Sequence, residues 1–499
     1  MNRAVDSWRW LLLLVVPSLV RALGVMARNP VGIPHAERLL AVSLATWLIA
    51  CLLALLLQVW EVTPIQSTTV AFVATVVFYW GGDVLDPFGD IGGLLLVMGL
   101  LVGLGVLIAR TRSEYPLKIV LVAVSVGLLS GPIVDLGNSM AAFGANTVDD
   151  EKDLNSAMAE KPDVWLVVLD GHPGVPAMKL DFGLTAIEEL EESLEAAGLS
   201  VHESAWSAFW TTDFSLPSIL NMGYPTEDPI ESDATKRALY EIVGGNNRLT
   251  DMLASNGYET YMVESGWSGS ACSTTFDHCI PSTWMDEPMF FMLAESLVSD
   301  FLLSRHGYAF TAGAASTMEW ALKNGESIAE DGAPSFVFAH VLAPHPPFLL
   351  DASCRIVYSN ERAGVTFNRA NIPPSEREEY LVAQMSCIRD FVVELSGRVG
   401  EDSVFVVVSD HGTDRRNQLI TDPAVWGHDA TVERMSVFLA TTESACRVAD
   451  GVLLPNLMRQ VLSCYSSDGI EDVQDHMFTG YDVELSPQQM RAVRGVAGG

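Results

Sequence analysis

The stretch VFVVVSDHGTD, residues 404–414, decides how the C-terminal part of this chain folds. Its first five residues are apolar without alternation, and such a run predicts a strand buried on both faces of a parallel sheet. A second run, VWLVVLDGHPG at residues 164–174, has the same form and delivers Asp170. Ligands of open α/β sheets bind at the carboxyl ends of strands. Asp170, Asp410 and His411 are therefore candidates for a functional site.

Further elements are expected in the same part of the chain. The pattern predicts strands at 164–169, 261–264, 335–341, 404–409 and 435–439, and helices at 184–197, 288–303, 313–324, 375–397 and 452–463. Strands that alternate with helices indicate an α/β sandwich with a mainly parallel central sheet. Residues 138–160 are small, polar and charged, as expected of a linker. The predicted organisation is an apolar domain over 1–137, this linker, and an α/β domain over 161–499.

The two parts differ in charge. The 499 residues include 29 basic and 62 acidic ones, for a formal net charge of -33. Residues 1–150 hold only 8 basic and 10 acidic residues, whereas residues 151–499 hold 21 and 52. Nucleic acid is excluded as a partner because phosphate backbones bind clustered Lys and Arg. An apolar part followed by an acidic one also excludes a disordered chain and a purely cytosolic enzyme.

Uncharged stretches in the first part are long enough to cross a bilayer. They cover 39–60, 62–82, 91–109 and the shorter 119–134, which Leu117 and the stem of Lys118 extend. The stretch 10–20, between Arg9 and Arg21, fits a signal sequence as well as a span. With this stretch taken as a span, the sequence predicts a transmembrane bundle of about five helices.

Basic residues set the expected orientation, since positively charged loops stay in the cytoplasm. Arg110, Arg112 and Lys118 mark one loop as cytoplasmic, and the acidic loop before residue 91 is then outside. The last span runs outward, so everything after about residue 140 is expected to be extracytoplasmic. Five spans leave Arg28 and Arg38 outside, against the rule.

Cysteine usage agrees with an extracytoplasmic domain. Cys51 lies in a predicted span, and the other six cysteines all lie in the acidic part. An even number in an oxidising compartment favours disulfide bonds. Proximity in sequence favours the pairs Cys272–Cys279, Cys354–Cys387 and Cys446–Cys464. Six unrelated buried thiols are the alternative.

A hydroxyl-rich turn lies between the two carboxylates along the chain. It reads SAFWTTDFSLPSILNMGYP, residues 207–225, with Pro217 near the start of an expected helix. The helix dipole and a bound metal both lower the pKa of a hydroxyl at a helix N-terminus, which would make it a nucleophile. Thr212 and Ser215 are the candidates. N-capping by Ser215 or Thr212 is the structural alternative.

Histidines follow or precede further strands. The segment FAHVLAPHPPFLLD, residues 338–351, carries His340 and His345, and prolines rigidify the loop around His345. His428, in AVWGHDATVERMSVF at residues 424–438, precedes a strand and could complete a site. Carboxylates and imidazoles together suit Zn or Mn. Each of these residues taken alone is more often a cap, a turn or a surface residue.

In chain order the pattern is strand-Asp-Gly, Thr-x-x-Ser-x-Pro-Ser, His-x-x-x-x-His-Pro-Pro, Ser-Asp-His-Gly and a final His. It resembles the alkaline phosphatase and sulfatase superfamily, and more closely its membrane-anchored bacterial branch of phosphoethanolamine transferases and lipoteichoic acid synthases. The resemblance covers roughly residues 160–445 and the apolar part before them. It implies an N-terminal transmembrane bundle, typically of five helices, and an extracytoplasmic, alkaline-phosphatase-like catalytic domain.

The resemblance also implies roles for single residues. Metal ligands would be Asp170, Asp410, His411 and the nucleophile Thr212, and a second metal or the substrate phosphate would be bound by His345 and His428. The transferases have Glu where this chain has Asp170. Sulfatases need Arg after Ser-x-Pro-Ser, where this chain has Ile219, which argues against a sulfatase and leaves Ser215 as the fallback nucleophile.

The sequence thus predicts a membrane-anchored, metal-dependent sulfatase-like enzyme. It would transfer or cleave a phospho-group of a membrane lipid or an envelope phosphodiester through a threonine nucleophile. The divalent metal would be Zn or Mn, with Mg or Ca as alternatives. A sulfuric ester hydrolase acting on an envelope sulfate ester, and a non-catalytic membrane protein with a degenerate site, are the competing hypotheses.

Overall fold

A computed structural model provides the structure of this chain. The residues that it describes are 9–28, 36–59, 62–80, 108, 113–141, 157–182, 184–225, 233–273, 275–283, 286–293, 307–330, 332–357, 373–415, 422, 425–479 and 483–495.

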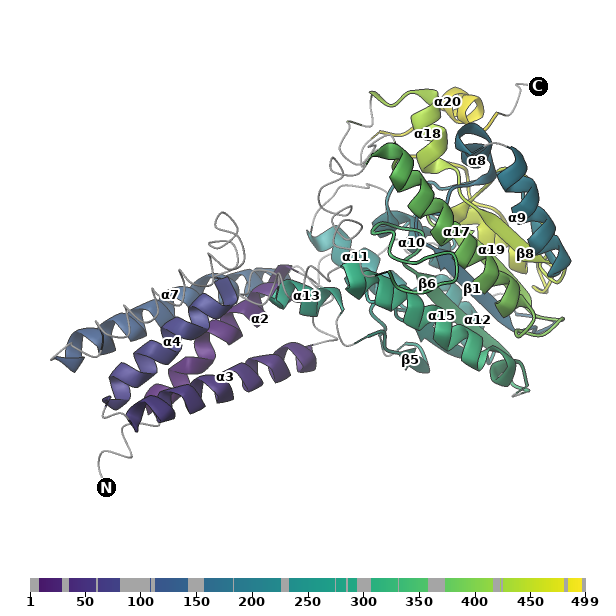
Figure 1. Cartoon of the computed structure of the whole chain (residues 1–499). Coiled ribbons are helices and arrows are strands. Elements are labelled where there is room, and N and C mark those ends of the chain that lie inside the picture. Colours follow the sequence, from purple (N-terminus) through teal and green to yellow (C-terminus); the bar gives the residue numbers. More distant parts are fainter. Residues whose placement is uncertain are drawn as a thin grey trace. The chain divides into compact units, whose positions relative to one another are not determined.

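The chain forms two compact units (Figure 1). One contains Met1–Ala145 together with Trp284–His306, and the other contains Asn146–Thr283 and Gly307–Gly499. A segment from the C-terminal part of the sequence therefore belongs to the apolar unit, which the sequence did not predict. The described part of that segment is Asp286 with helix α13, Glu287–Leu293.

Apolar helices make up the described part of the first unit. Besides α13, they are η1 (Leu12–Val15), α2 (Val16–Arg28), α3 (Ala36–Gln58), α4 (Pro64–Trp80) and α7 (Glu114–Ala141). Among the described residues, three stretches are long and apolar enough to cross a membrane, namely Arg9–Ala27, Ala36–Gln58 and Glu114–Asp135. Helix α4, where the sequence predicts a span at 62–82, has 17 residues. The predicted span at 91–109 lies outside the described residues, apart from Ile108.

The second unit is built on a seven-stranded sheet with the order β2-β8-β7-β1-β6-β4-β5. Its strands are β1 (Val164–Leu169), β2 (Leu199–Val201), β4 (Glu259–Val263), β5 (His278–Ile280), β6 (Ser335–Val341), β7 (Val404–Ser409) and β8 (Leu439–Thr442). Strand β1 pairs in parallel with β6 and β7, and β4 and β5 continue the parallel part. Strand β8 runs antiparallel to both of its neighbours, β7 and β2, so β2 has the same direction as the parallel strands. The predicted, mainly parallel α/β sandwich is confirmed.

Helices cover both faces of the sheet because β1, β6 and β7 are buried along their whole length. One face packs against α10 (Thr212–Leu220), α11 (Asp233–Val243), α12 (Arg248–Ser255) and α19 (Leu454–Leu462). The other packs against α8 (Val175–Asp181), α9 (Leu184–Ala196), α15 (Gly307–Glu330) and α17 (Pro374–Ser396). Strands β3 (Ala205–Trp206) and β9 (Val452–Leu453) form a separate two-stranded sheet, and α20 (Pro487–Val493) is the last described helix.

One predicted strand is wrong in its position. The sequence predicts a strand at 435–439, but Met435 ends helix α18 (His428–Met435) and β8 begins at Leu439. The intervening Val437 and Phe438 are buried all the same. An apolar run indicates that its residues are buried, not which element they form. Here the buried residues belong to a helix end, a connection and the start of a strand.

All three predicted disulfide bonds are confirmed. Cys272 pairs with Cys279, Cys354 with Cys387, and Cys446 with Cys464. Cys51, in α3, is the free cysteine among the described residues. The bond between Cys354 and Cys387 closes the longest loop, with a sequence separation of 33 against 7 and 18 for the others.

Loop length predicts how much each disulfide stabilises the second unit. A cross-link lowers the entropy of the unfolded chain more when the loop is longer. We expect Cys354→Ala/Cys387→Ala to lower the free energy of unfolding by about 3 to 4 kcal/mol, and Cys272→Ala/Cys279→Ala by roughly 2 kcal/mol. Denaturant titration of the full-length protein in detergent measures both. An equal loss in the two variants would contradict the loop-length argument.

Candidate functional site

Three neighbouring strands deliver the first residues of the site. Successive side chains of a strand alternate between the two faces of a sheet. Asp170 directly follows β1, Asp410 directly follows β7, and His340 is the penultimate residue of β6. The register pairs Val168 with His340 and Leu169 with Ser409. All three side chains therefore point to the face that carries α10.

These three residues form a compact group. One ligand atom of each lies within 4.8 Å of the others, and all three side chains are buried. His340 Nε2 is 3.6 Å from Asp170 Oδ2. A buried Asp–His–Asp group of this kind could hold a metal ion.

Helix α10 brings the candidate nucleophile to the same place. Its residues Leu216, Ile219 and Leu220 pack into the core on that face of the sheet. Thr212 is the first residue of the helix, following the extended N-cap Thr211. Thr212 Oγ1 lies 3.0 Å from His411 Nε2. The hydroxyl thus sits at a helix N-terminus, where the dipole favours negative charge.

His411 is oriented by its backbone surroundings. Its Nδ1 lies 2.9 Å from the carbonyl oxygen of Gly412, so Nδ1 carries the proton and donates it there. Nε2 then presents a lone pair toward Thr212, with Asp410 Oδ2 at 3.3 Å and Asp170 Oδ1 at 3.8 Å. Burial lowers the pKa of the His411 ring well below its usual value, so the ring is neutral at neutral pH. A neutral, oriented imidazole is the form that binds a metal.

Asp410 is fixed through one oxygen only. Its Oδ1 accepts hydrogen bonds from the backbone N–H groups of Gly171 and His411, at 3.0 and 2.9 Å. Gly171 has a φ of 70°, which favours glycine and turns its N–H toward Asp410. The other oxygen of Asp410 is left to face the centre of the cluster.

Four buried atoms at the centre have no hydrogen-bond partner among the described residues. They are Asp170 Oδ1, Asp410 Oδ2, and Nδ1 and Nε2 of His340. Burial, followed by the charge of Asp410, raises the pKa of Asp170 well above its usual value. Burial lowers the pKa of His340 to about 4. Two adjacent buried carboxyl groups, of which Asp170 resists ionisation, and a neutral imidazole fit a divalent cation, which would supply the missing positive charge and the missing partners.

Arg434, near the end of α18, joins the two loops of the site. Its Nε donates to the carbonyl of Trp210 at 2.7 Å, and its Nη1 donates to the carbonyl of Gly412 at 3.0 Å. Burial lowers its pKa to about 10, which leaves it charged at neutral pH. Its charge opposes the rise in the pKa of Asp170. Arg434 therefore fixes the turn that carries Thr212 against the Asp410–Gly412 loop.

The loop after His411 is packed tightly on α18. A Cβ at Gly412 would lie 1.9 Å from the carbonyl oxygen of Glu433, so no larger residue fits without a backbone shift. The carboxylate of Glu433 accepts hydrogen bonds from the Thr413 hydroxyl and the Arg415 backbone N–H. The glycine of the Ser-Asp-His-Gly motif thus permits a close approach of two backbones.

Ser215, the alternative nucleophile, lies inside the protein. It is fully buried, and its hydroxyl is bonded to Ser207 Oγ at 2.8 Å and to the carbonyl of Phe209 at 3.0 Å. Thr212 is half-buried. The two hydroxyls therefore differ in access, which favours Thr212.

The remaining predicted histidines differ in position. His345 is half-buried, and its charge lowers the pKa of both His340 and His411, so it lies near the cluster. His428 is exposed and is the first residue of α18. No hydrogen bond or ion pair joins it to the cluster within the described part of the chain. Their predicted roles in binding a second metal or phosphate stay predictions.

His340 is the site residue that the sequence analysis left without a role. The signal was present, because His340 lies two residues after Phe338 and four after Phe336 in an apolar strand. Both phenylalanines pack on the face that carries Asp170 and Asp410. Period-two alternation along this strand would have assigned His340 to the site.

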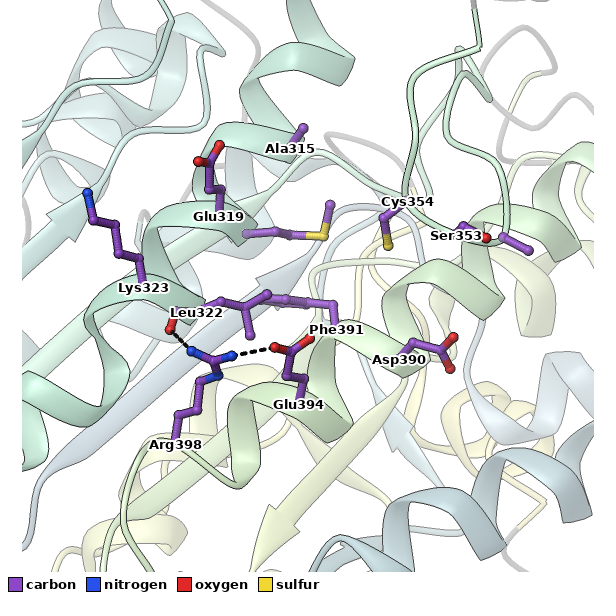
Figure 2. Close-up of a pocket in the computed structure, with 12 residues that line it drawn as sticks. Ala315, Glu319, Leu322, Lys323, Ser353, Cys354, Asp390, Phe391, Glu394 and Arg398 are labelled. Carbon is purple, nitrogen blue, oxygen red and sulfur yellow. Dashed lines mark hydrogen bonds and ion pairs between the residues drawn. The ribbon is translucent and has the colours of Figure 1, made fainter.

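A pocket of about 650 Å³ lies elsewhere in the second unit, between α15 and α17 (Figure 2). Met318, Leu322 and Phe391 contribute apolar surface, and Arg398 bridges the Leu322 carbonyl and Glu394. None of the cluster residues lines it. We therefore take the Asp170 cluster, which carries the reactive groups, as the candidate active site.

No family model matches the chain, and no curated protein matches it. Solved structures are similar in fold. The C-terminal periplasmic domain of EcEptC from Escherichia coli is 13% identical, with a TM-score of 0.40 over 69% of this chain and 96% of that chain. A protein in the alkaline phosphatase superfamily from Vibrio parahaemolyticus is 11% identical, with a TM-score of 0.39 over 65% of this chain and 73% of that chain.

The putative sulfatase yidJ from Bacteroides fragilis is also similar, at 11% identity, with a TM-score of 0.37 over 64% of this chain and 76% of that chain. These neighbours fall in the groups that the sequence motifs resemble. Because identities and TM-scores are low, we draw the function of this chain from its own side chains.

Proposed function

We propose that this protein is a membrane-anchored, metal-dependent enzyme that transfers or hydrolyses a phospho-group through Thr212. The observation that carries the proposal is the 3.0 Å approach of Thr212 Oγ1 to His411 Nε2, beside two buried carboxylates. A half-buried hydroxyl at a helix N-terminus, placed where the ligand atoms of a candidate metal site converge, is the arrangement expected of an activated nucleophile.

A metal ion would be held by Asp170, Asp410 and His411, with His340 as a further nitrogen ligand. When bound, it would supply the positive charge that lowers the pKa of the Thr212 hydroxyl and polarises the phosphoryl oxygens. Mixed carboxylate and imidazole ligands favour Zn or Mn over Mg or Ca.

The residues of this chain have separate tasks. Helix α10 and Arg434 hold Thr212 in place. Its hydroxyl loses its proton to solvent, and its oxygen then forms the bond to phosphorus as the bond to the donor oxygen breaks. The phospho-group then passes from Thr212 to a second alcohol or to water. His345 is the group proposed to protonate the leaving oxygen, since it is half-buried beside the cluster. His428 is proposed to bind the substrate phosphate.

The substrate is proposed from location. Helices in the first unit that are long enough to span a membrane would anchor the second unit beside lipid headgroups. A lipid phosphodiester, or another phosphodiester of the envelope, is therefore the proposed donor. We further propose that the anchor is a multi-pass domain over 1–137, that 138–160 form a linker, and that 161–499 are extracytoplasmic. The three disulfide bonds support an oxidising compartment.

Assays of the full-length protein in detergent, with Mn or Zn, test the proposed reaction. Aryl phosphodiesters, phosphomonoesters and sulfate esters are offered in parallel. We expect turnover of the phosphodiester. Turnover of sulfate ester alone would support the sulfatase alternative, and an absence of both turnover and bound metal would support a non-catalytic protein.

Arg434 offers a test of positioning. Arg434→Lys keeps the charge but cannot reach both carbonyls with a planar fork. We expect kcat to fall by roughly 10²-fold, since small displacements of reacting groups have effects of this size. Metal affinity, measured by calorimetry, should change little because the charge remains. Loss of metal in step with kcat would contradict a positioning role.

A further inference from the structure

Helix α13 is the described part of a C-terminal segment that belongs to the first unit. The chain reaches it from β5 and continues to α15, both of which belong to the second unit. Its residues Met289, Met292 and Leu293 pack with Ala22, Val25, Leu39 and Tyr79 of the apolar helices. A short helix from the acidic part of the sequence is thus buried against the predicted membrane spans.

Both ends of α13 are held by arginines of those spans. Arg38, near the start of α3, forms an ion pair of 2.7 Å with Asp286, and Asp286 also caps α13 by accepting from the backbone N–H of Met289. Arg21, in α2, donates to the carbonyls of Phe291 and Met292 at 2.6 and 3.2 Å. The last carbonyls of a helix lack partners within the helix, so Arg21 satisfies groups that would otherwise need water.

The two arginines differ in their depth along the spans. Arg38 is the third residue of the stretch Ala36–Gln58, at its end. Arg21 lies six residues before the end of the stretch Arg9–Ala27, which is about 9 Å inside it at 1.5 Å per residue. A helix of seven residues is about 10 Å long. In a bilayer spanned by these stretches, helix α13 would run from their end to the level of Arg21, where water is scarce.

At that level, the Arg21 guanidinium and the C-terminal carbonyls of α13 satisfy each other's need for a polar partner. A charged side chain inside a span is costly unless it is paired, and backbone carbonyls are among its usual partners. Backbone carbonyls in hydrocarbon must in turn be satisfied by protein groups. Phe291, which is 44% exposed, is the large apolar side chain that α13 leaves uncovered. Leu40 and Leu44 at the same end of α3 are exposed too, as lipid-facing residues are.

We propose that α13 is seated in one leaflet of the bilayer, with Phe291 against the acyl chains and its C-terminal carbonyls satisfied by Arg21. The occupant of this surface is the bilayer itself, since the surface is continuous with helices that are predicted to span it. The proposal accounts for Arg38, whose expected position outside breaks the positive-inside rule. Its charge is neutralised by Asp286, from the part of the chain that is expected on the same side.

Spin labels on the full-length protein, in vesicles of phosphatidylcholine and phosphatidylglycerol, test whether α13 lies in the bilayer. In a Cys51→Ser background, single cysteines replace Phe291, Leu48 in the middle of α3, and Glu192 on the exposed face of α9. Collisions with oxygen, which concentrates in lipid, are compared with collisions with a polar nickel complex. We expect the labels at 291 and 48 to collide often with oxygen and rarely with the nickel complex. The label at 192 should collide freely with the nickel complex.

A second variant distinguishes placement of α13 in the bilayer from burial of α13 within the protein. Arg21→Met removes the donors to the α13 carbonyls, and we expect it to restore nickel accessibility at residue 291 while leaving residue 48 unchanged. A label at 291 that meets nickel as freely as the label at 192 would overturn the proposal, and so would a label that neither collider reaches. These readouts do not use enzymatic activity, so they stand apart from the proposed reaction.

Discussion

Replacement of Thr212 by alanine is expected to abolish phosphodiester turnover while the protein remains folded. The loss should be on the order of 10⁶-fold in kcat, as for the removal of other catalytic nucleophiles. The hydroxyl is half-buried and makes one hydrogen bond, to His411, so its removal leaves no large cavity. Initial rates with an aryl phosphodiester measure the effect, and circular dichroism checks the fold.

Ser215→Ala is the matched control for this change. Both substitutions remove one hydroxyl from the same helix, but Ser215 bonds only to groups inside the protein. We expect Ser215→Ala to lower stability by about 1 kcal/mol and to keep most of the activity. Thr212→Ser, which retains an alcohol at the same place, should keep a measurable rate. The opposite ranking of Thr212→Ala and Ser215→Ala would transfer the nucleophile role to Ser215.

Trapping the intermediate extends the test. A phospho-group that passes through Thr212 forms an ester with its Oγ, which adds the mass of the group to the peptide containing residue 212. We expect this adduct after acid quenching of the wild-type protein with a phosphodiester substrate. The adduct should be absent from Thr212→Ala. Turnover without any adduct in the wild-type protein would favour direct attack by water.

Much of the sheet could be predicted because its central strands are continuous apolar runs. The predicted bounds of the strands at 164–169, 335–341 and 404–409 agree with those of β1, β6 and β7. Such strands are buried on both faces, so every position in them carries the signal. At 435–439 the apolar residues belong to a helix end and a connection, and a burial pattern alone does not separate these from a strand.

The site was predicted in part for the same reason. Asp170 and Asp410 interrupt apolar runs at their ends, where a polar residue is conspicuous. His340 stands inside the run and was noted without a role, although its position relative to Phe338 gives its face. Arg434 could not be assigned, because its partners are the carbonyls of Trp210 and Gly412, and backbone groups leave no trace in a sequence.

The return of residues 286–293 to the apolar unit could not be predicted either. The sequence shows a short apolar stretch there, which a helix of the second unit would explain equally well. The two arginines that hold it lie about 250 to 270 positions away, and their pairing with Asp286 and two carbonyls depends on the tertiary structure.

Asp410→Asn and Asp170→Asn are both expected to remove metal binding. Asp170→Asn is also expected to raise the stability of the metal-free protein. Burial and the neighbouring Asp410 raise the pKa of Asp170 in the folded state. The folded state then holds its proton more strongly than the unfolded state does, so ionisation of Asp170 lowers stability at neutral pH. That cost fades as the pH falls through the folded pKa. Asp170→Asn should therefore stabilise the metal-free protein at neutral pH.

Bound metal is expected to make the wild-type protein more stable than the Asp170→Asn variant. A metal that binds only the folded state at 100 times its Kd stabilises it by about 2.7 kcal/mol. We expect wild-type protein treated with a chelator to gain this stability when Zn or Mn is restored, and both Asn variants to gain none. Thermal unfolding of the full-length protein, with metal content measured by mass spectrometry, follows both quantities.

Asp163→Asn is the control for charge removal alone. Asp163 precedes β1, and burial raises its pKa as well, but it bonds the Ser335 backbone N–H at the opposite end of the strand. We expect this variant to keep the full response to metal. A response to metal that survives in Asp410→Asn and Asp170→Asn would place the ion elsewhere. Because two buried carboxylates and an unpartnered imidazole stand together here only at a cost in stability, a bound cation is the simplest reason for that arrangement.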